Sequence, residues 1–432
     1  MGSSTRAAQV TQPRPTTTRA GQVTQARPTT VQPAQVTQPS PSSKLNMKRT
    51  RAAQVTQPRP TTTQPAQVTQ PAQITLPSPL WVSTGSMTTP RQLPTLTLLK
   101  SSKVIVTGGY TGGSNNGFTA TCEIFDQSTG QWSPTASMAT ARYYHRATLL
   151  DSGSVLVSGG ITLSSYTASC EIYDPLTSQW SPTGTMAANR RSHTATLLNS
   201  GKVLVAGGEG GSSGADTASC EIYDPLTGQW SPTGAMTTVR HYHTATLLSS
   251  GKVLVTGGQD EVNAQNTVNT FASCEIYDPL TGQWSPTGSM TTARVFHTAT
   301  LLQSGKVIVT GGGPLSPVNS GLPSVATASC EIYDPLTGQW SPTASMATTR
   351  AQHTATLFNS GKVIVAGGRI TSSNLVGSSE IYDPLTGQWS PTASMITPRW
   401  NYAATLLNTG DVLAAGGQAA SGVTATCEIY YP

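Results

Sequence analysis

The chain contains one pattern of about 50 residues in seven copies, and this repeat constrains its fold more than any other feature. A tryptophan marks each copy: Trp81, Trp132, Trp180, Trp230, Trp284, Trp340 and Trp389. Ten residues later stands an arginine: Arg91, Arg142, Arg190, Arg240, Arg294, Arg350 and Arg399. Seventeen residues after the arginine comes a Gly-Gly pair, which begins at Gly108, Gly159, Gly207, Gly257, Gly311, Gly367 and Gly416. Differences in length fall between this pair and a cysteine, or Ser379 in one copy.

Each copy contains four short segments that we expect to be strands. Residues 243–248 alternate small and larger side chains and lead through a Ser-Gly-Lys turn into an apolar run, which is typical of a strand covered on both faces. A variable segment then leads to the third strand, CEIYD, and a turn with Pro and Gly leads to the fourth, which begins at the tryptophan. The repeat therefore predicts an all-β fold made of four-stranded antiparallel sheets.

The recurring Gly-Gly, Tyr-Asp and Trp resemble the Kelch repeat, and the resemblance covers essentially all of residues 80–432. It implies a seven-bladed β-propeller with one four-stranded antiparallel sheet in each blade. More distantly, the chain is similar to the propeller domain of galactose-oxidase-like proteins.

The two ends of the repeat region complement each other. The last copy stops at residues 427–432, before its tryptophan, whereas residues 80–87 match the tryptophan-containing strand of later copies without any strand before them. We therefore predict that an N-terminal strand around Trp81 completes the last blade. This closure would remove a free sheet edge.

Residues 1–78 differ from the repeat region, residues 79–432, in composition and charge. They consist mainly of Thr, Pro, Gln, Ala and Val, which predicts a disordered tail because large apolar residues are scarce. Nine of the 25 basic residues lie there without any acid, so the propeller region has 16 basic and 19 acidic residues. The basic overall charge therefore predicts no specific nucleic-acid surface on the propeller. Because no secretory signal or apolar membrane-spanning run is found, the sequence favours a cytoplasmic location.

The residues that recur in each copy are predicted to build the scaffold. The tryptophan and tyrosine are expected to fill the space between blades, and the arginine and the glutamate after the cysteine to form buried polar ties. The cysteines occupy equivalent points in different blades, too far apart for disulfides, so we expect small buried side chains and regard Ser379 as an optional replacement.

Five histidines occupy one repeat position, three residues after the arginine: His145, His193, His243, His297 and His353. Hydrogen bonding within the blade is the favoured interpretation, because a metal site near the axis would need supporting residues around its ligands that the sequence does not show. His241 alone lies outside this pattern. We predict no metal, no cofactor and no catalytic residue.

A binding surface is predicted at the end of the blades where the chain varies. The segments that enter the first strands and the segments after Gly-Gly share this end, whereas the turns at the other end are nearly identical in all copies. The candidate binding residues follow the repeat arginine: Tyr143, Tyr144, Arg191, Ser192, His241, Tyr242, Phe296, Gln352, Trp400 and Asn401. The long segments 259–273 and 313–329 are expected to form a wall on one side. Sequence drift at unconstrained positions is the alternative.

The predicted function is that of a monomeric scaffold that binds a protein or peptide. Two alternatives remain open. The galactose-oxidase resemblance implies a copper enzyme with Tyr144, His145, Tyr242 and His243 at its metal, although the Cys–Tyr crosslink and the additional domain of that family are not matched. A carbohydrate-facing surface protein, with residues 1–78 as a glycosylated stalk, is the other.

Overall fold

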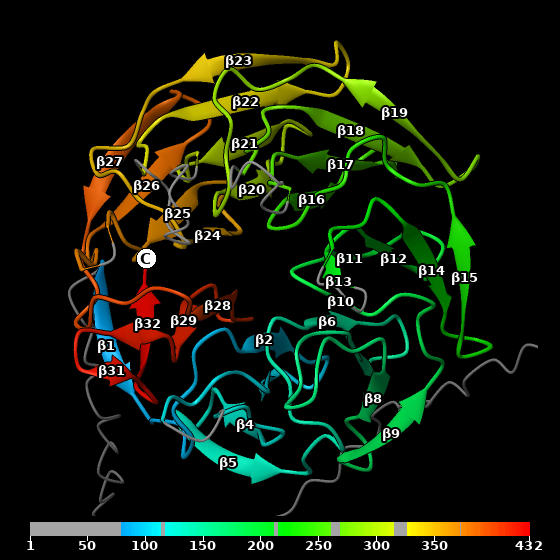
Figure 1. The fold of residues 1–432 in the computed structure, drawn as a ribbon. Coiled ribbons are helices and arrows are strands. Elements are labelled where there is room, and N and C mark those ends of the chain that lie inside the picture. The colour runs from blue at the N-terminus through cyan, green and yellow to red at the C-terminus, as the bar shows by residue number, and fades with distance from the viewer. Residues whose placement is uncertain (1–78, 114–116, 211–214, 261–267, 315–325, 372) are drawn as a thin grey trace, which may run out of the picture. The chain divides into compact units, whose positions relative to one another are not determined.

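The computed structural model describes residues 79–432 except 114–116, 211–214, 261–267, 315–325 and 372. Seven four-stranded antiparallel sheets are arranged as blades around a central axis (Figure 1), which confirms the predicted β-propeller. The predicted tail, residues 1–78, lies outside the described residues, and so does the stalk of the surface-protein alternative. Within the described ranges, no helix is long and apolar enough to cross a membrane.

Six blades are each formed by consecutive parts of the chain. Blade 1 contains β2 (Thr95–Leu98), β3 (Lys103–Thr107), β4 (Cys122–Asp126) and β5 (Gln131–Thr135). Blade 2 contains β6 (Arg146–Leu149), β7 (Val155–Ser158), β8 (Cys170–Asp174) and β9 (Gln179–Thr183). Blade 3 contains β11 (Thr194–Leu197), β12 (Val203–Ala206), β14 (Cys220–Asp224) and β15 (Gln229–Thr233). Blade 4 contains β16 (Thr244–Leu247), β17 (Val253–Thr256), β18 (Cys274–Asp278) and β19 (Gln283–Thr287).

The remaining blades follow the same order. Blade 5 contains β20 (Thr298–Leu301), β21 (Val307–Thr310), β22 (Cys330–Asp334) and β23 (Gln339–Thr343). Blade 6 contains β24 (Thr354–Leu357), β25 (Val363–Ala366), β26 (Ser379–Asp383) and β27 (Gln388–Thr392). Blade 7 contains β28 (Ala403–Leu406), β29 (Val412–Ala415), β32 (Cys427–Tyr431) and β1 (Leu80–Thr84). Two short pairs, β10 (Arg190–Arg191) with β13 (Glu209–Gly210) and β30 (Gln418–Ala419) with β31 (Gly422–Val423), lie outside the blades.

Burial explains the different sequences of the four strands. The second strand of each blade, such as β17, is buried at every position except Lys103 of β3, because neighbouring blades cover both of its faces. The outer strand, such as β19, alternates exposed and half-buried residues and contains Pro286, whose missing N–H is tolerated at a sheet edge. The aromatic residues pack between blades as predicted: Tyr277 of blade 4 donates to or accepts from Thr233 of blade 3, with 2.7 Å between the hydroxyl oxygens.

The N-terminal strand closes the ring, as predicted. β1 is antiparallel to β32 over five residues, with Trp81 opposite Tyr430, so the last blade has the order β28, β29, β32, β1. The Trp81 and Tyr430 rings pack with 5.3 Å between their centroids. Trp81 is 5% exposed. The first described strand is therefore part of the core of the last blade.

Ser379 has a specific role at this closure, which corrects its interpretation as an optional replacement. Its Oγ accepts a hydrogen bond of 3.1 Å from Trp81 Nε1, linking blade 6 to the N-terminal strand. In five other blades the tryptophan Nε1 donates to a backbone carbonyl of the preceding blade, as Trp284 does to Gly234. A side-chain acceptor is therefore present at the seam where the chain closes on itself.

We expect Ser379→Ala to lower the free energy of unfolding by about 1–3 kcal/mol, because a buried indole N–H then loses its acceptor. The measurement is urea unfolding of Ser379→Ala with Trp81 intact and with Trp81→Phe, which removes the donor. The two substitutions should be coupled by about 1 kcal/mol. Additive effects would show that the hydrogen bond contributes nothing.

The recurring arginine and glutamate form the predicted buried ties, one pair in each blade. In blade 4, Arg240 is fully buried and its Nη2 lies 2.9 Å from Glu275 Oε1, while its Nη1 donates to the carbonyl of Gly257. The glutamate also accepts from the backbone N–H of Thr237. This network fixes the segment that leads from the outer strand of one blade to the first strand of the next.

The prediction for the five repeat histidines is wrong in one respect, because their hydrogen bonds run between blades. His145 of blade 2 has its Nε2 3.0 Å from Thr107 Oγ1 of blade 1, and His353 of blade 6 has its Nε2 2.9 Å from Thr310 Oγ1 of blade 5. Burial, reinforced by Arg142, lowers the pKa of His145 to about 3. The histidine is therefore neutral and holds neighbouring blades together near the axis.

Candidate binding surface around the propeller axis

Seven backbone positions with unusual geometry surround the axis on the face viewed in Figure 1. The second residue after each repeat arginine has a φ between 52° and 56°, and we call these residues the axial ring: Leu93, Tyr144, Ser192, Tyr242, Phe296, Gln352 and Asn401. Backbone hydrogen bonds join neighbouring members, from Ser192 N to Tyr144 O at 3.3 Å and from Tyr242 N to Ser192 O at 3.2 Å. Such bonds are found at four of the seven contacts between neighbouring members and help to hold the backbone in this conformation.

The side chains of the axial ring are not those that this conformation favours. Left-handed backbone geometry suits glycine and, to a lesser degree, asparagine, and costs other residues roughly 1–2 kcal/mol. One member is Asn401 and none is glycine, although the other positive-φ positions of the repeat, such as Gly257 and Gly258, carry glycine in every copy except at Ser102 and Ser178. The ring thus keeps varied side chains in spite of the backbone cost.

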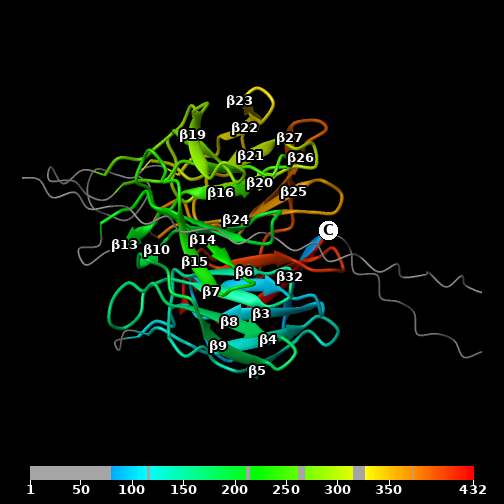
Figure 2. The ribbon, with the colours of Figure 1, turned by 90° about the vertical axis from the view of Figure 1, so that its right-hand side faces the viewer.

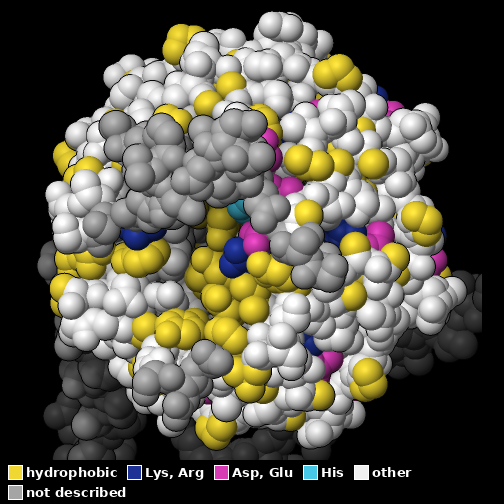
Figure 3. Space-filling view, viewed as in Figure 1, with side chains coloured by type: hydrophobic (Ala, Val, Ile, Leu, Met, Phe, Trp, Pro, Cys, Tyr) yellow, Lys and Arg dark blue, Asp and Glu magenta, His cyan; other side chains and the backbone are white. Residues whose placement is uncertain are grey.

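The axial ring lines a pocket of about 200 Å³. Aromatic side chains form part of its wall, with ring centroids 5.9 Å apart for Tyr144 and Tyr242 and 4.7 Å apart for Tyr242 and Phe296. Hydrophobic side chains gather around the hollow at the centre of this face (Figure 3). Ser192 is fully buried and does not line the pocket, unlike the six other ring members.

Arg146 introduces a positive charge into this pocket. It replaces the threonine found at the same place in later copies, such as Thr244. Its Nε donates to the carbonyl of His193 at 2.7 Å, and within the described part of the chain no carboxylate forms an ion pair with it. Burial lowers the pKa of Arg146. The pocket can therefore accept an anionic group against an aromatic wall, a feature that the sequence analysis missed.

The residues directly after the repeat arginines form an outer rim around the axial ring. Tyr143 stacks on Phe118 with 4.6 Å between ring centroids, and the guanidinium carbon of Arg369 lies 3.7 Å from the centre of the Trp400 ring. Burial lowers the pKa of Arg369 to about 10. Tyr143 and Trp400 thus lie on the outer rim together with Phe118 and Arg369.

Arg191 and His241 lie on the same rim but belong to a polar cluster. Arg191 pairs with Glu209, at 2.6 Å from Nη2 to Oε2, and His241 is buried beside Asp216. In the side view, β10 and β13, which carry Arg191 and Glu209, lie together at one edge of the propeller (Figure 2). Parts of the predicted wall, residues 261–267 of segment 259–273 and residues 315–325 of segment 313–329, lie outside the described residues.

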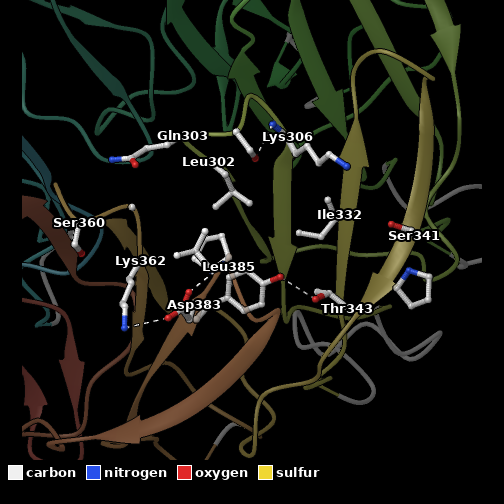
Figure 4. A pocket seen from close by; sticks show the side chains of 15 residues that line it. Leu302, Gln303, Lys306, Ile332, Ser341, Thr343, Ser360, Lys362, Asp383 and Leu385 are labelled. Atoms are coloured by element: carbon white, nitrogen blue, oxygen red, sulfur yellow. Dashed lines mark hydrogen bonds and ion pairs between the residues drawn. The ribbon is translucent and has the colours of Figure 1, made fainter.

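The opposite face has larger but repetitive grooves between blades. One of about 470 Å³ is lined by the Ser-Gly-Lys and Asp-Pro-Leu turns of blades 5 and 6, including Lys362, Asp383 and Leu385 (Figure 4). A similar groove of about 560 Å³ lies between blades 3 and 4. Because the same residue types recur in each groove, this face offers repeated shallow surfaces, whereas the axial pocket is made of differing residues.

Comparison with known proteins agrees with this architecture. A family model described as the KLHDC2/KLHL20/DRC7 Kelch-repeats domain matches residues 78–258 and 192–417. The chain belongs to the Kelch-repeat family. No curated protein matched the sequence.

A solved structure of similar fold is a novel fungal alcohol oxidase of the AA5 family, in complex with copper. Its TM-score against this Kelch propeller is 0.66 at 18% sequence identity, with 82% of this chain and 76% of that chain covered. At this identity the likeness shows the fold alone.

The residues named for a copper centre do not fit one in this Kelch propeller. His145 and His243 direct their Nε2 atoms to Thr107 and Thr194 in different interfaces between blades. The cysteines that a Cys–Tyr crosslink would need are buried on the third strands, as Cys274 is, where burial raises the pKa of the thiol to about 11. We therefore derive no copper chemistry from these residues.

Proposed function

We propose that this Kelch propeller is a binding module whose axial ring and outer rim hold a protein or peptide partner. The observation that carries the proposal is the axial ring itself, where varied side chains occupy strained backbone positions on an otherwise uniform scaffold. Strain of this kind is typical of functional sites. The membership in the Kelch family supports protein partners, because many members of that family bind proteins.

The chemistry of the surface indicates what such a partner presents. Aromatic and arginine side chains dominate the energetics of protein interfaces, and Tyr144, Tyr242, Phe296 and Arg146 converge on one pocket. An acidic side chain next to an apolar one would match the arginine and the aromatic wall together. The partner is therefore expected to insert a short acidic and apolar segment at the axis.

We expect a variant with Tyr144→Asn, Tyr242→Asn, Phe296→Asn and Arg146→Thr to lose its partners while remaining folded. Asparagine already occupies this backbone geometry at Asn401, and threonine is the usual repeat residue at the Arg146 position. Because one interface hot spot contributes at least about 2 kcal/mol, capture of partners from a lysate of the source organism should fall at least about tenfold.

The matched control changes three leucines on the opposite face, Leu226→Asn, Leu280→Asn and Leu336→Asn, each of which is 96% exposed. This control removes a similar amount of apolar surface without touching the axis, and it should capture the same proteins as the native chain. Equal capture by the axial variant and the native chain would reject the proposal. Loss of partners in the leucine control alone would show instead that the partners bind to the opposite face.

A further inference from the structure

A buried polar cluster lies where blades 3 and 4 meet on the face of the axial ring. Glu209 of β13 belongs to blade 3 and pairs with Arg191 on one side and with Asp216 on the other. His241 and Gln259 belong to blade 4 and pair with each other. Glu209, Asp216 and His241 each have one possible metal-ligand atom, and these three atoms lie within 4.8 Å of one another. The cluster is separate from the axial pocket, which none of these three residues lines.

The contact between His241 and Asp216 is short but poorly aligned for a hydrogen bond. His241 Nδ1 lies 2.7 Å from Asp216 Oδ1, yet neither atom has a hydrogen-bond partner among the described residues, and Asp216 Oδ2 is also buried without one. The side chains are 5% and 3% exposed. A buried carboxylate with both oxygens unsatisfied is costly, so a missing partner at this place would explain the arrangement.

A shared cation is compatible with this arrangement. Two ligands of a tetrahedral zinc ion, each about 2.0–2.1 Å from the metal, lie roughly 3.3 Å apart, so His241 Nδ1 and Asp216 Oδ1 would need to separate by about 0.6 Å from their 2.7 Å contact to hold one ion. One imidazole and two carboxylates suit a divalent transition metal, whereas calcium and magnesium prefer oxygen ligands throughout.

We propose that Glu209, Asp216 and His241 form a binding site for a divalent transition-metal ion, with zinc as the reference ion. Asp216 and Glu209 offer carboxylate oxygens and His241 offers Nδ1. Three protein ligands leave one position of a tetrahedral zinc ion open. The ion would fasten the segment after the Gly-Gly pair of blade 3 to the start of blade 4, at the outer rim.

The residues around the cluster are arranged as supports of metal ligands are. Tyr166 donates its hydroxyl to Glu209 Oε1 at 2.6 Å, and Arg191 donates to both oxygens of the same carboxylate. The side-chain amide nitrogen of Gln259 lies 3.0 Å from His241 Nε2, and its Oε1 is buried without a partner. With the amide turned over, Oε1 accepts from Nε2–H and leaves the lone pair of Nδ1 for a metal.

The charges of the cluster are compatible with a dication. Glu209 is already paired with Arg191, so the charge that lacks compensation is that of Asp216. A bound dication would balance it.

The test is calorimetric titration of the chelator-treated full chain with zinc chloride, and separately with calcium and magnesium. We expect one zinc ion per chain and no comparable binding of the other two. Asp216→Asn and His241→Val should each weaken zinc binding more than about 100-fold, because even the loss of a supporting residue typically costs 10–100-fold. Val295 occupies the position equivalent to His241, which makes His241→Val compatible with the fold.

Asp260→Asn serves as the matched control, since this acid lies close by and hydrogen-bonds to Asn269 rather than to the cluster. It should bind zinc like the native chain. Cobalt gives a second readout, because its visible absorption reports nitrogen and oxygen ligands and should disappear in Asp216→Asn. Absence of zinc binding by the native chain, or equal binding by Asp216→Asn and His241→Val, would overturn the site and identify an Asp–His pair without metal. Neither result would affect the proposed partner binding at the axis.

Discussion

A chain that begins at residue 91 is expected to be at least about 5 kcal/mol less stable than one that begins at residue 76. The shorter chain lacks β1, and with it Trp81, whose removal from a core alone costs about 3–5 kcal/mol. It also exposes the ladder of β32 as a free edge and removes the buried Met87. Because a domain is stable by about 5–15 kcal/mol in total, much of the shorter chain should be unfolded.

Thermal unfolding of the two chains measures this effect, and a peptide of residues 76–90 added in trans provides the control. The peptide should raise the melting temperature of the shorter chain in proportion to the logarithm of its concentration, because it binds the folded state. It should leave the longer chain unchanged, since β1 already occupies the site. Equal melting temperatures of the two chains would show that β1 is not needed for closure.

The propeller and its closure could be predicted because both follow directly from the spacing of the repeat. The seven tryptophans and seven Gly-Gly pairs at the repeat positions give the number of blades, and the incomplete copies at residues 80–87 and 427–432 give the place where the ring closes. Burial and hydrogen bonding then follow from one sheet repeated around an axis. The sequence could not show that Ser379 accepts from Trp81, because the two residues are 298 positions apart and no other copy has the same pair.

The candidate site was less accessible to sequence reasoning. The variable positions after each arginine were found, but their positive φ depends on backbone hydrogen bonds between blades, such as that from Gln352 N to Phe296 O. Arg146 was missed because it lies inside a strand that appeared to be scaffold. Its departure from the repeat threonine was the signal that could have revealed it.

The histidines show a similar limit of sequence reasoning, here for residues that recur in the repeat. Their shared position indicated a scaffold role, yet only the arrangement of blades shows that the partner of His353 belongs to blade 5. His241, by contrast, stood outside the pattern, and it is the histidine that joins the acidic cluster. Exceptions to a repeat are therefore more informative about function than its recurring residues.

The propeller is expected to lose stability steeply as the pH falls below about 6.5, well before its carboxylates titrate. Burial lowers the pKa of His297 to about 3, as it does for His145, and it places those of His193, His243 and His353 well below the ordinary value. A group with a lowered basic pKa stabilises the fold fully above its unfolded pKa and loses that contribution as the pH falls, because the unfolded chain then binds more protons.

Each such histidine contributes a loss of about 1.4 kcal/mol per pH unit below its unfolded pKa of 6.5, so five together reach several kcal/mol by pH 5.5. Acidic groups also cause a loss of stability as the pH falls, but in a separate and lower pH range. The lowered pKa of Glu331, opposed by burial but favoured by the N–H of Thr291 and by Arg294, gives stability that is lost below about pH 4.5. Urea unfolding at pH 7.5, 6.5 and 5.5 therefore isolates the histidines.

The chain itself supplies a matched substitution that does not titrate in this range. Blade 7 has Tyr402 at the histidine position, and its hydroxyl donates to the carbonyl of Ala366, which replaces the threonine found as Thr310 in blade 5. The paired change His353→Tyr with Thr310→Ala should fold and reduce the pH dependence between 7.5 and 5.5 by about one fifth. A stability that stays constant over this range in the native chain, or an unchanged slope in the paired variant, would show that these histidines do not control the acid response.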